Sequence, residues 1–387
     1  MKSQRQRKVV YDLVQPKTKL KLRHQQRHSD RFNPKIAELD VIWKDNQRGT
    51  LPKLLKLNES LRTTEWPYPF NTTTHRIREA DARNLDWIPS RSVHLIVTSP
   101  PYWTLKQYET HAGQLGEIDL YEKFLDELDK AWAECARVLV PGGRICCVVG
   151  DVCVPRKREG RHYVMPLHAD IQVRMRKIGL DCLTPILWFK IANGVTEAKG
   201  NGAGFYGKPY QPGAIIKNDV EYILFFRKGG EYRSPTPIQK TLSMLSREEM
   251  KSWLTSSWSD IKGESTRKGH PAPFPIPLAE RLIRLFSFAG DTVLDPFCGT
   301  STTSVAAINT GRNSIACDIE PKYISLATER LSKETKHERT HGATTCIVTT
   351  DIGTCAEQGK ASTVLTFNAG DCTAVGKDFA VVIPGSI

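Results

Sequence analysis

The sequence contains no apolar run long enough to cross a lipid bilayer. A membrane-spanning helix needs about 20 consecutive apolar residues. The hydrophobic residues make up 40% of this 387-residue chain but are scattered in short groups. The first ten residues, MKSQRQRKVV, also lack the apolar core of a secretory signal. We therefore expect a cytoplasmic protein.

The cysteine spacing typical of zinc sites is absent as well. The chain has ten cysteines but no CxxC pair, which is the spacing that structural zinc sites commonly use. Cys146 and Cys147 are adjacent within the apolar run RICCVVG, a context that suits a protein core. We expect buried free thiols in a reducing compartment and no bound metal.

Acidic residues are in the minority. The chain has 55 lysines and arginines against 42 aspartates and glutamates, a formal charge of +13. Residues 1–60 hold 15 of the basic and six of the acidic residues, and so carry +9 of that charge. A basic segment favours a polyanionic partner, because each phosphate contact releases counterions. A solubilising arm would have the same composition.

From about residue 75 the chain alternates between strand and helix patterns. Residues 121–139 carry apolar side chains at helical spacing, and residues 93–98 (VHLIVT) form the short apolar run of a buried strand. The alternation predicts an α/β fold with a doubly wound, mostly parallel, Rossmann-like sheet. We expect strands at residues 75–80, 93–98, 144–149, 185–189, 292–295 and 313–318, and helices at 121–139, 167–178, 278–286, 301–310 and 321–331.

Residues 191–260 interrupt this alternation. Glycine and asparagine cluster at 193–194 and 200–204, and residues 220–227 form one predicted strand. Loops on a rigid scaffold often carry recognition, so we predict an inserted recognition region; a plain surface loop of this length would be uncommon. Weaker patterns predict short helices at 36–43 and 51–57, and strands at 363–367 and 379–383.

Residues 295–301 (DPFCGTS) form a small-residue turn between a predicted strand and a predicted helix. Such a turn lets N–H groups at the helix start approach a ligand. Asp318, which lies 23 residues further on, ends the next strand, where a carboxylate can accept hydrogen bonds from ribose hydroxyls. The turn contains neither GxGxxG nor a P-loop lysine, so S-adenosylmethionine fits better than NAD, FAD or a nucleoside triphosphate. A purely structural turn is the alternative.

A second polar segment, residues 98–103 (TSPPYW), follows the strand predicted at 93–98. Two prolines remove N–H donors and fix the backbone, so hydroxyl and carbonyl acceptors are offered at the carboxyl edge of the sheet. Acceptors suit an exocyclic amine, and aromatic rings suit stacking on a base. Taken alone, such a segment is more often an ordinary turn.

Together the two segments resemble the amino-methylating DNA methyltransferases. Residues 99–102 (SPPY) look like the family's catalytic (Asp/Asn/Ser)-Pro-Pro-(Tyr/Phe) motif. Residues 295–301 look like its cofactor motif, Asp-Pro-Phe-x-Gly-x-Gly, with serine in place of the last glycine, and residues 270–275 (HPAPFP) resemble the segment that opens the cofactor half. The catalytic motif comes first, as in the permuted beta group. The resemblance covers about residues 75–335.

The resemblance implies both sets of site residues. The catalytic residues would be Ser99, Pro100, Pro101 and Tyr102, with Tyr102 stacking on the target base. The cofactor site would comprise Asp81, Phe274, Asp295, Phe297, Gly299, Thr300, Ser301 and Asp318. We expect a basic N-terminal arm (1–60), a catalytic half (61–190), a target-recognition insertion (191–260), a cofactor-binding half (261–335) and a tail without an assigned role (336–387).

With serine at position 99, the motif is most similar to that of the cytosine-N4-specific DNA methyltransferases of restriction-modification systems. The resemblance implies methylation of double-stranded DNA on a flipped base, by direct displacement, with a cognate restriction nuclease as a second partner. Adenine-N6 methylation, an RNA N-methyltransferase and a DNA-binding protein without cofactor are the alternatives. Cytosine-C5 methylation would need a Pro-Cys nucleophile, and the sequence has no Pro-Cys dipeptide.

Overall fold

The computed structural model describes residues 50–62, 66–103, 113–190, 219–263, 274–334, 345–352 and 361–368. The chain divides into two compact units, residues 1–47 and 48–387, and all of the described residues belong to the second. The helix predicted at 36–43, the glycine clusters near 200, His270 and the strand predicted at 379–383 lie outside the described residues.

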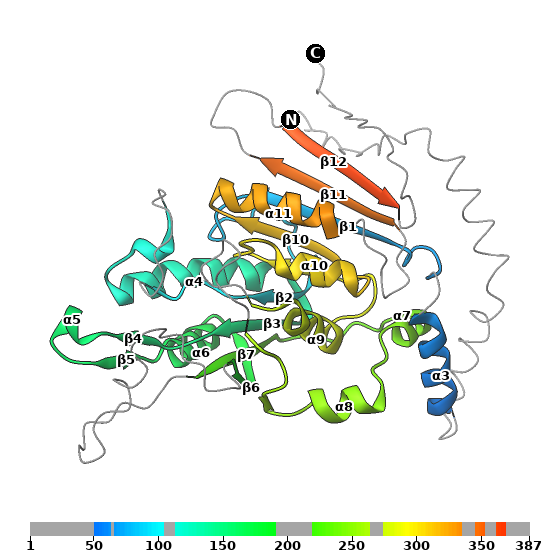
Figure 1. The fold of residues 1–387 in the computed structure, drawn as a ribbon, viewed down its shortest axis with the longest axis horizontal. Helices are drawn as coiled ribbons and strands as arrows, with labels where there is room; N and C mark the ends of the chain where they lie inside the picture. The colour runs from blue at the N-terminus through cyan, green and yellow to red at the C-terminus, as the bar shows by residue number, and fades with distance from the viewer. Residues whose placement is uncertain are drawn as a thin grey trace, which may run out of the picture. The chain divides into compact units, whose positions relative to one another are not determined.

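The described residues form a sheet of ten strands, which runs through the centre of the second unit (Figure 1). Across the sheet the strands are β12 (Ala361–Asn368), β11 (Thr345–Ile352), β1 (Thr72–Glu79), β10 (Asn313–Asp318), β9 (Thr292–Asp295), β2 (Val93–Thr98), β3 (Leu139–Val149), β7 (Val220–Lys228), β6 (Leu180–Phe189) and β8 (Ser257–Trp258). Strands β11 to β3 in this order are all parallel. The mostly parallel sheet predicted from the sequence is confirmed.

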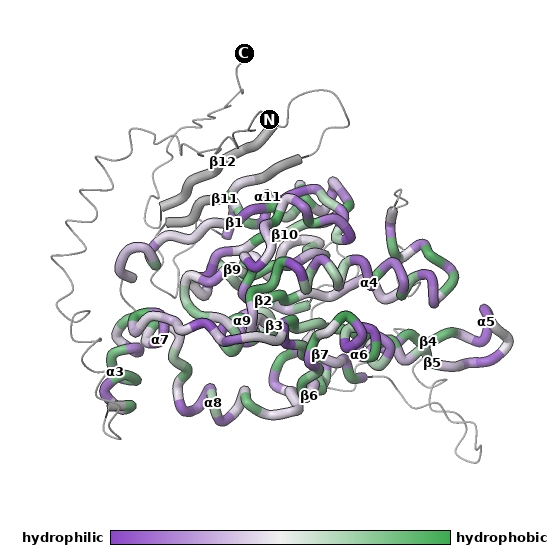
Figure 2. The backbone as a smooth tube through the Cα atoms, turned by 180° about the vertical axis from the view of Figure 1, so that it is seen from behind, coloured by the Kyte–Doolittle hydropathy of each residue, from purple (hydrophilic) through white to green (hydrophobic). Residues whose placement is uncertain are grey.

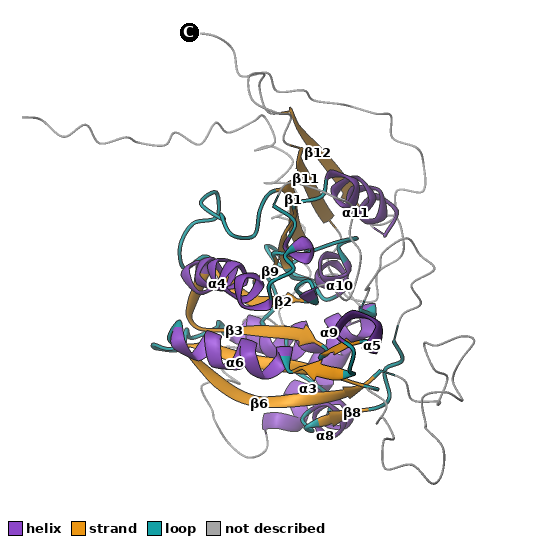
Figure 3. Ribbon diagram, turned by 90° about the vertical axis from the view of Figure 1, so that its left-hand side faces the viewer, coloured by secondary structure: helices purple, strands orange, loops and turns teal. Residues whose placement is uncertain are grey.

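Helices cover both faces of the sheet (Figure 3). Helices α4 (Tyr121–Val138) and α6 (Leu167–Lys177) pack on one face, and α9 (Ile276–Phe286), α10 (Thr302–Asn309) and α11 (Pro321–Glu334) pack on the other. Side chains alternate between the two faces along each strand: in β2, Ile96 joins the α4 side, whereas Leu95 and Val97 join the α9 side. The sheet is therefore doubly wound, as expected.

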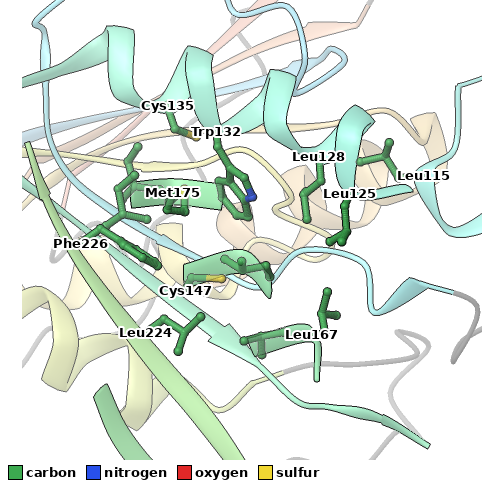
Figure 4. Packing of buried hydrophobic residues seen from close by; sticks show 14 of the residues in the cluster. Leu115, Leu125, Leu128, Trp132, Cys135, Cys147, Leu167, Met175, Leu224 and Phe226 are labelled. Carbon is green, nitrogen blue, oxygen red and sulfur yellow. The ribbon is translucent and has the colours of Figure 1, made fainter. Parts of the chain in front are cut away.

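The core beneath α4 shows why this helix is so clearly encoded (Figure 4). Its apolar stripe places Leu125, Leu128, Trp132 and Cys135 against the sheet, and each is at most 2% exposed. Burial of a large apolar side chain stabilises the fold by about 1.5–3 kcal/mol. This packing holds β2 in place through Ile96, and residues 99–102 directly follow β2.

Four parts of the fold add to the sequence-based expectation. Strand β7 lies inside the sheet, antiparallel to both β3 and β6, although it falls within the segment that we set apart for recognition. Strands β4 (Val152–Val154) and β5 (Tyr163–Met165) form a separate antiparallel ribbon, whose tip is the short helix α5 (Arg156–Glu159). In the tail, β11 and β12 extend the sheet beyond β1. Residues 141–143 (Pro-Gly-Gly), which lie between the predicted helix and the predicted strand, belong to β3, where its pairing with β2 is irregular.

The strand order creates a crevice at the carboxyl ends of β2 and β9. Strands β2 and β9 are adjacent, but the chain leaves β2 toward β3 and leaves β9 toward β10. The connections diverge and leave a crevice at the carboxyl ends of the two strands, where ligands bind in open α/β sheets. Within the described residues, no helix is both long and apolar enough to span a membrane.

Candidate active site

A cavity lies at this crevice and is lined by half of the predicted site residues; Tyr102, Phe274, Asp295, Gly299, Thr300 and Ser301 are not among its lining. It is lined by Asp81, Ala82, Ser99, Pro100, Pro101, Gly113, Gln114, Leu115, Pro296, Phe297, Asp318, Ile319 and Tyr323. The lining comes from the ends of β1, β2, β9 and β10, the start of α11 and the segment before α4. The two sequence motifs therefore face one shared space, although about 200 residues of chain separate them.

The hydroxyl of Ser99 has a defined direction. Ser99 Oγ lies 3.2 Å from Tyr102 Oη, which lies 3.3 Å from the carbonyl oxygen of Val148. Because a carbonyl oxygen can only accept, Tyr102 donates its single proton to Val148 and accepts the proton of Ser99. The lone pairs of Ser99 Oγ are thereby left to act as acceptors at the cavity.

Tyr102 itself is only 6% exposed and belongs to the core cluster under α4. The predicted stacking face is therefore largely covered by protein. Trp103, the next residue, is 4% exposed, donates its indole N–H to the carbonyl of Ile118 and packs edge-on against Tyr121. Both aromatic side chains of the segment support the backbone that carries Ser99.

Asp295 faces inward rather than into the cavity. Its Oδ1 accepts from Thr98 Oγ1 and its Oδ2 accepts from Thr303 Oγ1, each at 2.7 Å. Burial raises the pKa of Asp295 to about 6, while the two threonine hydroxyls and the Phe297 N–H act in the opposite direction. Asp295 thus ties the end of β2 to the end of β9 and the start of α10, and holds the two motifs together.

Asp318 lines the cavity and retains acceptor capacity there. Its Oδ2 accepts from the Gly299 N–H at 2.9 Å, and its Oδ1 accepts from the Glu320 N–H at 3.0 Å. The Ile319 N–H also interacts with this carboxylate. Its two oxygens have four lone pairs in total, more than these three N–H donors, so acceptor capacity remains for a ligand. Burial raises the pKa of Asp318 to about 6, partly offset by these N–H groups. Two vicinal hydroxyls of a ribose suit such a carboxylate.

Asp81 stands on the other side of the same cavity, at the end of β1. Arg83 binds both of its oxygens, at distances between 2.6 and 3.0 Å, and also binds Glu127 at 2.7 Å. Arg83 further donates to the carbonyl of Gly113, at 3.1 Å. This arginine therefore fixes the carboxylate and one cavity-lining backbone segment in place.

The turn after β9 has the left-handed backbone that its glycine pattern indicates. Gly299 has φ +48°, and Ser301 has φ +63° and ψ 39°. Ser301 is fully buried and hydrogen-bonds Ser304 Oγ at 3.1 Å. Serine here keeps the conformation that the family's glycine would adopt. Thr300 is clasped by Arg330, which reaches its carbonyl and hydroxyl oxygens at 3.2 Å.

Cys298 in this turn is not suited to nucleophilic chemistry. It is 6% exposed, and burial raises the pKa of its thiol well above the usual value, with Asp318 and Asp295 adding to the shift. A neutral, buried thiol is a poor nucleophile. Cys298 therefore does not supply a thiolate at this turn.

The remaining predicted residue, Phe274, packs against the core cluster beside α9 and is not among the cavity-lining residues. Sequence reasoning missed Gln114, Leu115, Ile319 and Tyr323. Ile319 directly follows Asp318, and Tyr323 lies five residues beyond it at the start of α11, so both could have been inferred from the strand-end position of Asp318. Gln114 and Leu115 reach the cavity only through the path of the chain before α4, for which the sequence has no local signal.

The chain is similar to several DNA-modifying enzymes. A family model described as DNA methylase matches residues 93–329, a span that includes both motifs. The type II methyltransferase M.MjaI of Methanocaldococcus jannaschii is 36% identical over 295 residues, which cover 68% of this chain and 93% of that protein. The DNA adenine methyltransferase YhdJ of Escherichia coli is 28% identical over 285 residues, covering 70% of this chain and 87% of that protein.

A similar solved structure is that of TTHA0409 from Thermus thermophilus, named as a DNA modification methylase and complexed with S-adenosyl-L-methionine. The two structures have a TM-score of 0.56 and 50% sequence identity. The similarity covers 67% of this chain and 94% of that chain. The match leaves about a third of this chain outside.

Proposed function

Because this chain belongs to the DNA methylase family, we propose that it transfers the methyl group of S-adenosylmethionine to the exocyclic N4 of cytosine in double-stranded DNA. The observation that carries the proposal is the hydroxyl of Ser99, held with its lone pairs at a cavity that Asp318 and Phe297 also line. The neutral Ser99 hydroxyl can accept hydrogen bonds from an amine. An amino group on a base is therefore a suitable target for methylation at this cavity.

The cavity residues fit S-adenosylmethionine. The Asp318 carboxylate keeps acceptor capacity for a ribose hydroxyl beyond its backbone N–H donors, and Phe297 offers an aromatic side chain, itself packed edge-on against Trp132. The turn at Gly299 to Ser301 supplies backbone at the start of α10. When bound, the cofactor supplies an electrophilic methyl group. Asp295 holds the cofactor turn against the catalytic segment.

The residues of the catalytic segment activate the target amine by accepting its hydrogens. Ser99 and Pro100 both line the cavity, and we assign Ser99 Oγ and the Pro100 carbonyl as the two acceptors. Hydrogen bonds from the amine to these acceptors turn the nitrogen lone pair out of conjugation with the base ring. The lone pair is then available for direct displacement. The amine must leave the duplex to reach this edge, so the base is flipped. Positioning of this kind lowers the barrier without a covalent intermediate.

The choice of cytosine rests on Ser99. In the family that the chain resembles, adenine enzymes mostly carry Asp or Asn at this position, and cytosine-N4 enzymes mostly carry Ser. A compact neutral hydroxyl suits cytosine N4, which is already conjugated with its ring. Adenine N6 is the second candidate, supported by the similarity to the adenine methyltransferase YhdJ.

Nucleoside analysis separates the two bases. Purified protein is incubated with S-adenosylmethionine carrying an isotopically labelled methyl group and a plasmid of mixed sequence, and the DNA is digested to nucleosides. We expect labelled N4-methyl-2′-deoxycytidine by chromatography and mass spectrometry. Labelled N6-methyl-2′-deoxyadenosine alone would overturn the base assignment. No labelled nucleoside from DNA, but label in RNA, would favour the RNA alternative; no cofactor binding at all would favour a DNA-binding protein without enzymatic activity.

A Ser99→Ala variant tests the role of the hydroxyl. We expect it to lose most methylation while its affinity for S-adenosylmethionine stays unchanged, because Ser99 is assigned to the target amine. Full activity in this variant would remove Ser99 from the mechanism. The matched control is Ser92→Ala, since Ser92 lies before β2, at the opposite end of the same strand, where its hydroxyl binds the carbonyl of Pro89.

Two further parts of the proposal concern partners. Within residues 191–260, the segments that flank β7 and β8 carry sequence recognition, because these two strands are themselves occupied in the sheet. A cognate restriction nuclease acting on the same site is proposed from the type II methyltransferase relatives. Exchange of the flanking segments with those of a relative should change the methylated site; an unchanged site would move recognition elsewhere.

A further inference from the structure

We propose that the basic end of the β4–β5 ribbon contacts the phosphates of the duplex that flank the target base. This inference rests on the proposed function, since it takes DNA as the substrate. The residues concerned are Arg156, Lys157 and Arg161, which lie around the tip of the ribbon. None of them belongs to the two sequence motifs or to the basic N-terminal segment.

The ribbon starts at the catalytic edge of the sheet. Strand β4 follows β3 after Gly150 and Asp151, and a Cβ added at Gly150 would lie 3.4 Å from the ring of Tyr102. Figures 1 and 2 both show the ribbon and α5 extending outward beyond the main sheet, with α5 coloured as hydrophilic in Figure 2. A duplex that delivers a flipped base to Ser99 would therefore pass close to this ribbon.

The base of the ribbon is rigidly packed. Val152 and Val154 are each 2% exposed and belong to the core cluster under α4, and Tyr163 and Met165 pack against the same cluster. A ribbon fixed in this way presents its tip at a defined position. Binding then costs less backbone conformational entropy, because the strands that carry the contact residues are already packed.

The tip carries positive charge that is open to solvent. Arg156, Lys157 and Arg161 are exposed, and a Cβ added at Gly160 would meet no atom within 4 Å. Among the side chains that the structure describes, no carboxylate forms an ion pair with these three residues. Exposed cations on a rigid ribbon are suited to phosphates, whose neutralisation releases counterions.

Arg158 has a different role from its neighbours. Its guanidinium lies 4.7 Å from the centre of the Trp103 ring and 3.6 Å from Asp119. Trp103 directly follows Tyr102 in the chain. Arg158 therefore seats the tip of the ribbon against the catalytic segment, so that the outward cations and Ser99 keep a fixed separation.

The salt dependence of DNA binding tests the inference. The test variant is Arg156→Ala/Lys157→Ala, and affinity for a duplex of about 30 base pairs is measured by fluorescence anisotropy at several salt concentrations. Each lost phosphate contact lowers the slope of log K against log salt by about 0.9, so we expect a slope lower by about 1–2. The same loss is expected on duplexes of unrelated sequence, because phosphates carry no sequence information.

The matched control is Arg176→Ala/Lys177→Ala. These two exposed cations end α6, just before β6 begins. Because β6 runs in the same direction as β3, they lie at the end of the sheet away from the cavity, and the control loses the same charge at a different place. We expect an unchanged slope for the control, and a restored slope for Arg156→Lys/Lys157→Arg. Equal slopes for the ribbon variant and the control would overturn the inference.

Failure of the proposed function has a different signature. Wild-type protein that binds duplex with a steep salt slope but yields no methylated nucleoside would contradict the function and leave the slope comparison valid. Wild-type protein without affinity for duplex would overturn both. Unchanged affinity of the ribbon variant for S-adenosylmethionine verifies that its active site is folded.

Discussion

At the scale of single residues, the direction of one hydroxyl proton decides what the catalytic segment can do. Ser99 can accept hydrogens from an amine only while its own proton points elsewhere. Tyr102 Oη accepts that proton because its own is committed to the Val148 carbonyl. In the proposed mechanism Tyr102 is therefore a positioning residue, and its ring, buried in the core, is secondary to its hydroxyl.

Replacement of Tyr102 by Phe isolates this effect. The ring and its packing remain, but Ser99 loses the acceptor for its proton. A net hydrogen bond is worth about 0.5–1.5 kcal/mol, so we expect a kcat lower by roughly 2- to 10-fold, with the Kd for S-adenosylmethionine unchanged. If stacking were the role of Tyr102, kcat would not change. Tyr232→Phe is the control. Tyr232 follows β7 and is not among the residues that line the cavity, and its hydroxyl accepts a hydrogen bond from Arg227 of β7.

Asp318 gives the cofactor site a pH dependence with a defined sign. Burial raises its pKa to about 6, so the carboxylate is ionised at pH 7 and largely protonated at pH 5. Ribose hydroxyls donate to the ionised form. Protonation removes acceptor capacity, so affinity falls as the pH is lowered through 6 and is constant well above it.

Methylthioadenosine is a suitable probe, because it keeps the ribose and has no amino-acid group that titrates in this range. We expect its affinity to drop by about tenfold between pH 7 and pH 5, in proportion to the ionised fraction of a group with a pKa near 6. The Asp318→Asn variant should bind about 10- to 100-fold more weakly at pH 7, from the loss of charge-assisted hydrogen bonds, and without this pH dependence. A pH profile shared by the two proteins would assign the titration to Asp295 instead.

At the scale of elements, the turn between β9 and α10 tests how far the family's glycine pattern is a backbone requirement. Ser301 adopts the left-handed conformation, which costs a residue with a Cβ about 1–2 kcal/mol. Its hydroxyl recovers part of that cost through the hydrogen bond to Ser304. The turn therefore keeps its shape without the usual glycine.

Paired variants separate the two contributions. Ser301→Ala loses the hydrogen bond and keeps the backbone cost, whereas Ser301→Gly loses both. We expect the glycine variant to be more stable than the alanine variant by about 1 kcal/mol in urea unfolding. If alanine were equal to or better than glycine, the left-handed geometry at this position would be wrong. Wild type should lie within about 1 kcal/mol of the glycine variant.

Most of the elements could be predicted because each carries its own periodic signal. The stripe of α4 and the apolar runs of β2 and β10 specify their elements locally, and the order of strand and helix specified a parallel sheet. The β4–β5 ribbon could not be predicted, because three-residue strands are too short to show alternation. The place of β7 within the sheet depends on pairing with β3 and β6, which is a tertiary property.

The site was predictable to the level of its motifs but not of its contacts. Strand-end position brought Ser99 and Asp318 to the cavity as expected. Asp295 ends a strand, as a ligand-binding carboxylate would. One of its actual hydrogen bonds is with Thr98 at the end of β2, a contact between strands that the local sequence does not reveal. The buried orientation of Tyr102 likewise depends on the core beneath α4.

At the scale of the whole molecule, the boundary of the basic N-terminal segment can be drawn more sharply than composition allows. Helix α3 (Thr50–Arg62) falls within the arm predicted at 1–60, yet it packs in a small core with Trp66 and Leu242. Asn58 also donates to the Thr241 carbonyl at 2.7 Å. The chain divides between residues 47 and 48, so α3 belongs with the catalytic unit.

Removal of residues 1–47 should therefore weaken DNA binding without unfolding the catalytic unit. This segment has 12 lysines and arginines against five acidic residues, a formal charge of +7. If half or more of that excess contacts phosphates, the salt slope should fall by about 3–6, with the affinity for S-adenosylmethionine unchanged. An unchanged slope would make the segment a solubilising arm.

Removal of residues 1–60 is the informative comparison for that experiment. It deletes most of α3 and leaves Trp66 and Leu242, which are 3% and 6% exposed in the intact chain, without their cover. Exposing buried apolar side chains costs about 1.5–3 kcal/mol each, so we expect this truncation to lower Tm by several degrees. The truncation at residue 47 should leave Tm unchanged. Equal Tm values for the two truncations would show that α3 adds nothing to the stability of the catalytic unit, and would return the boundary of the arm to residue 60.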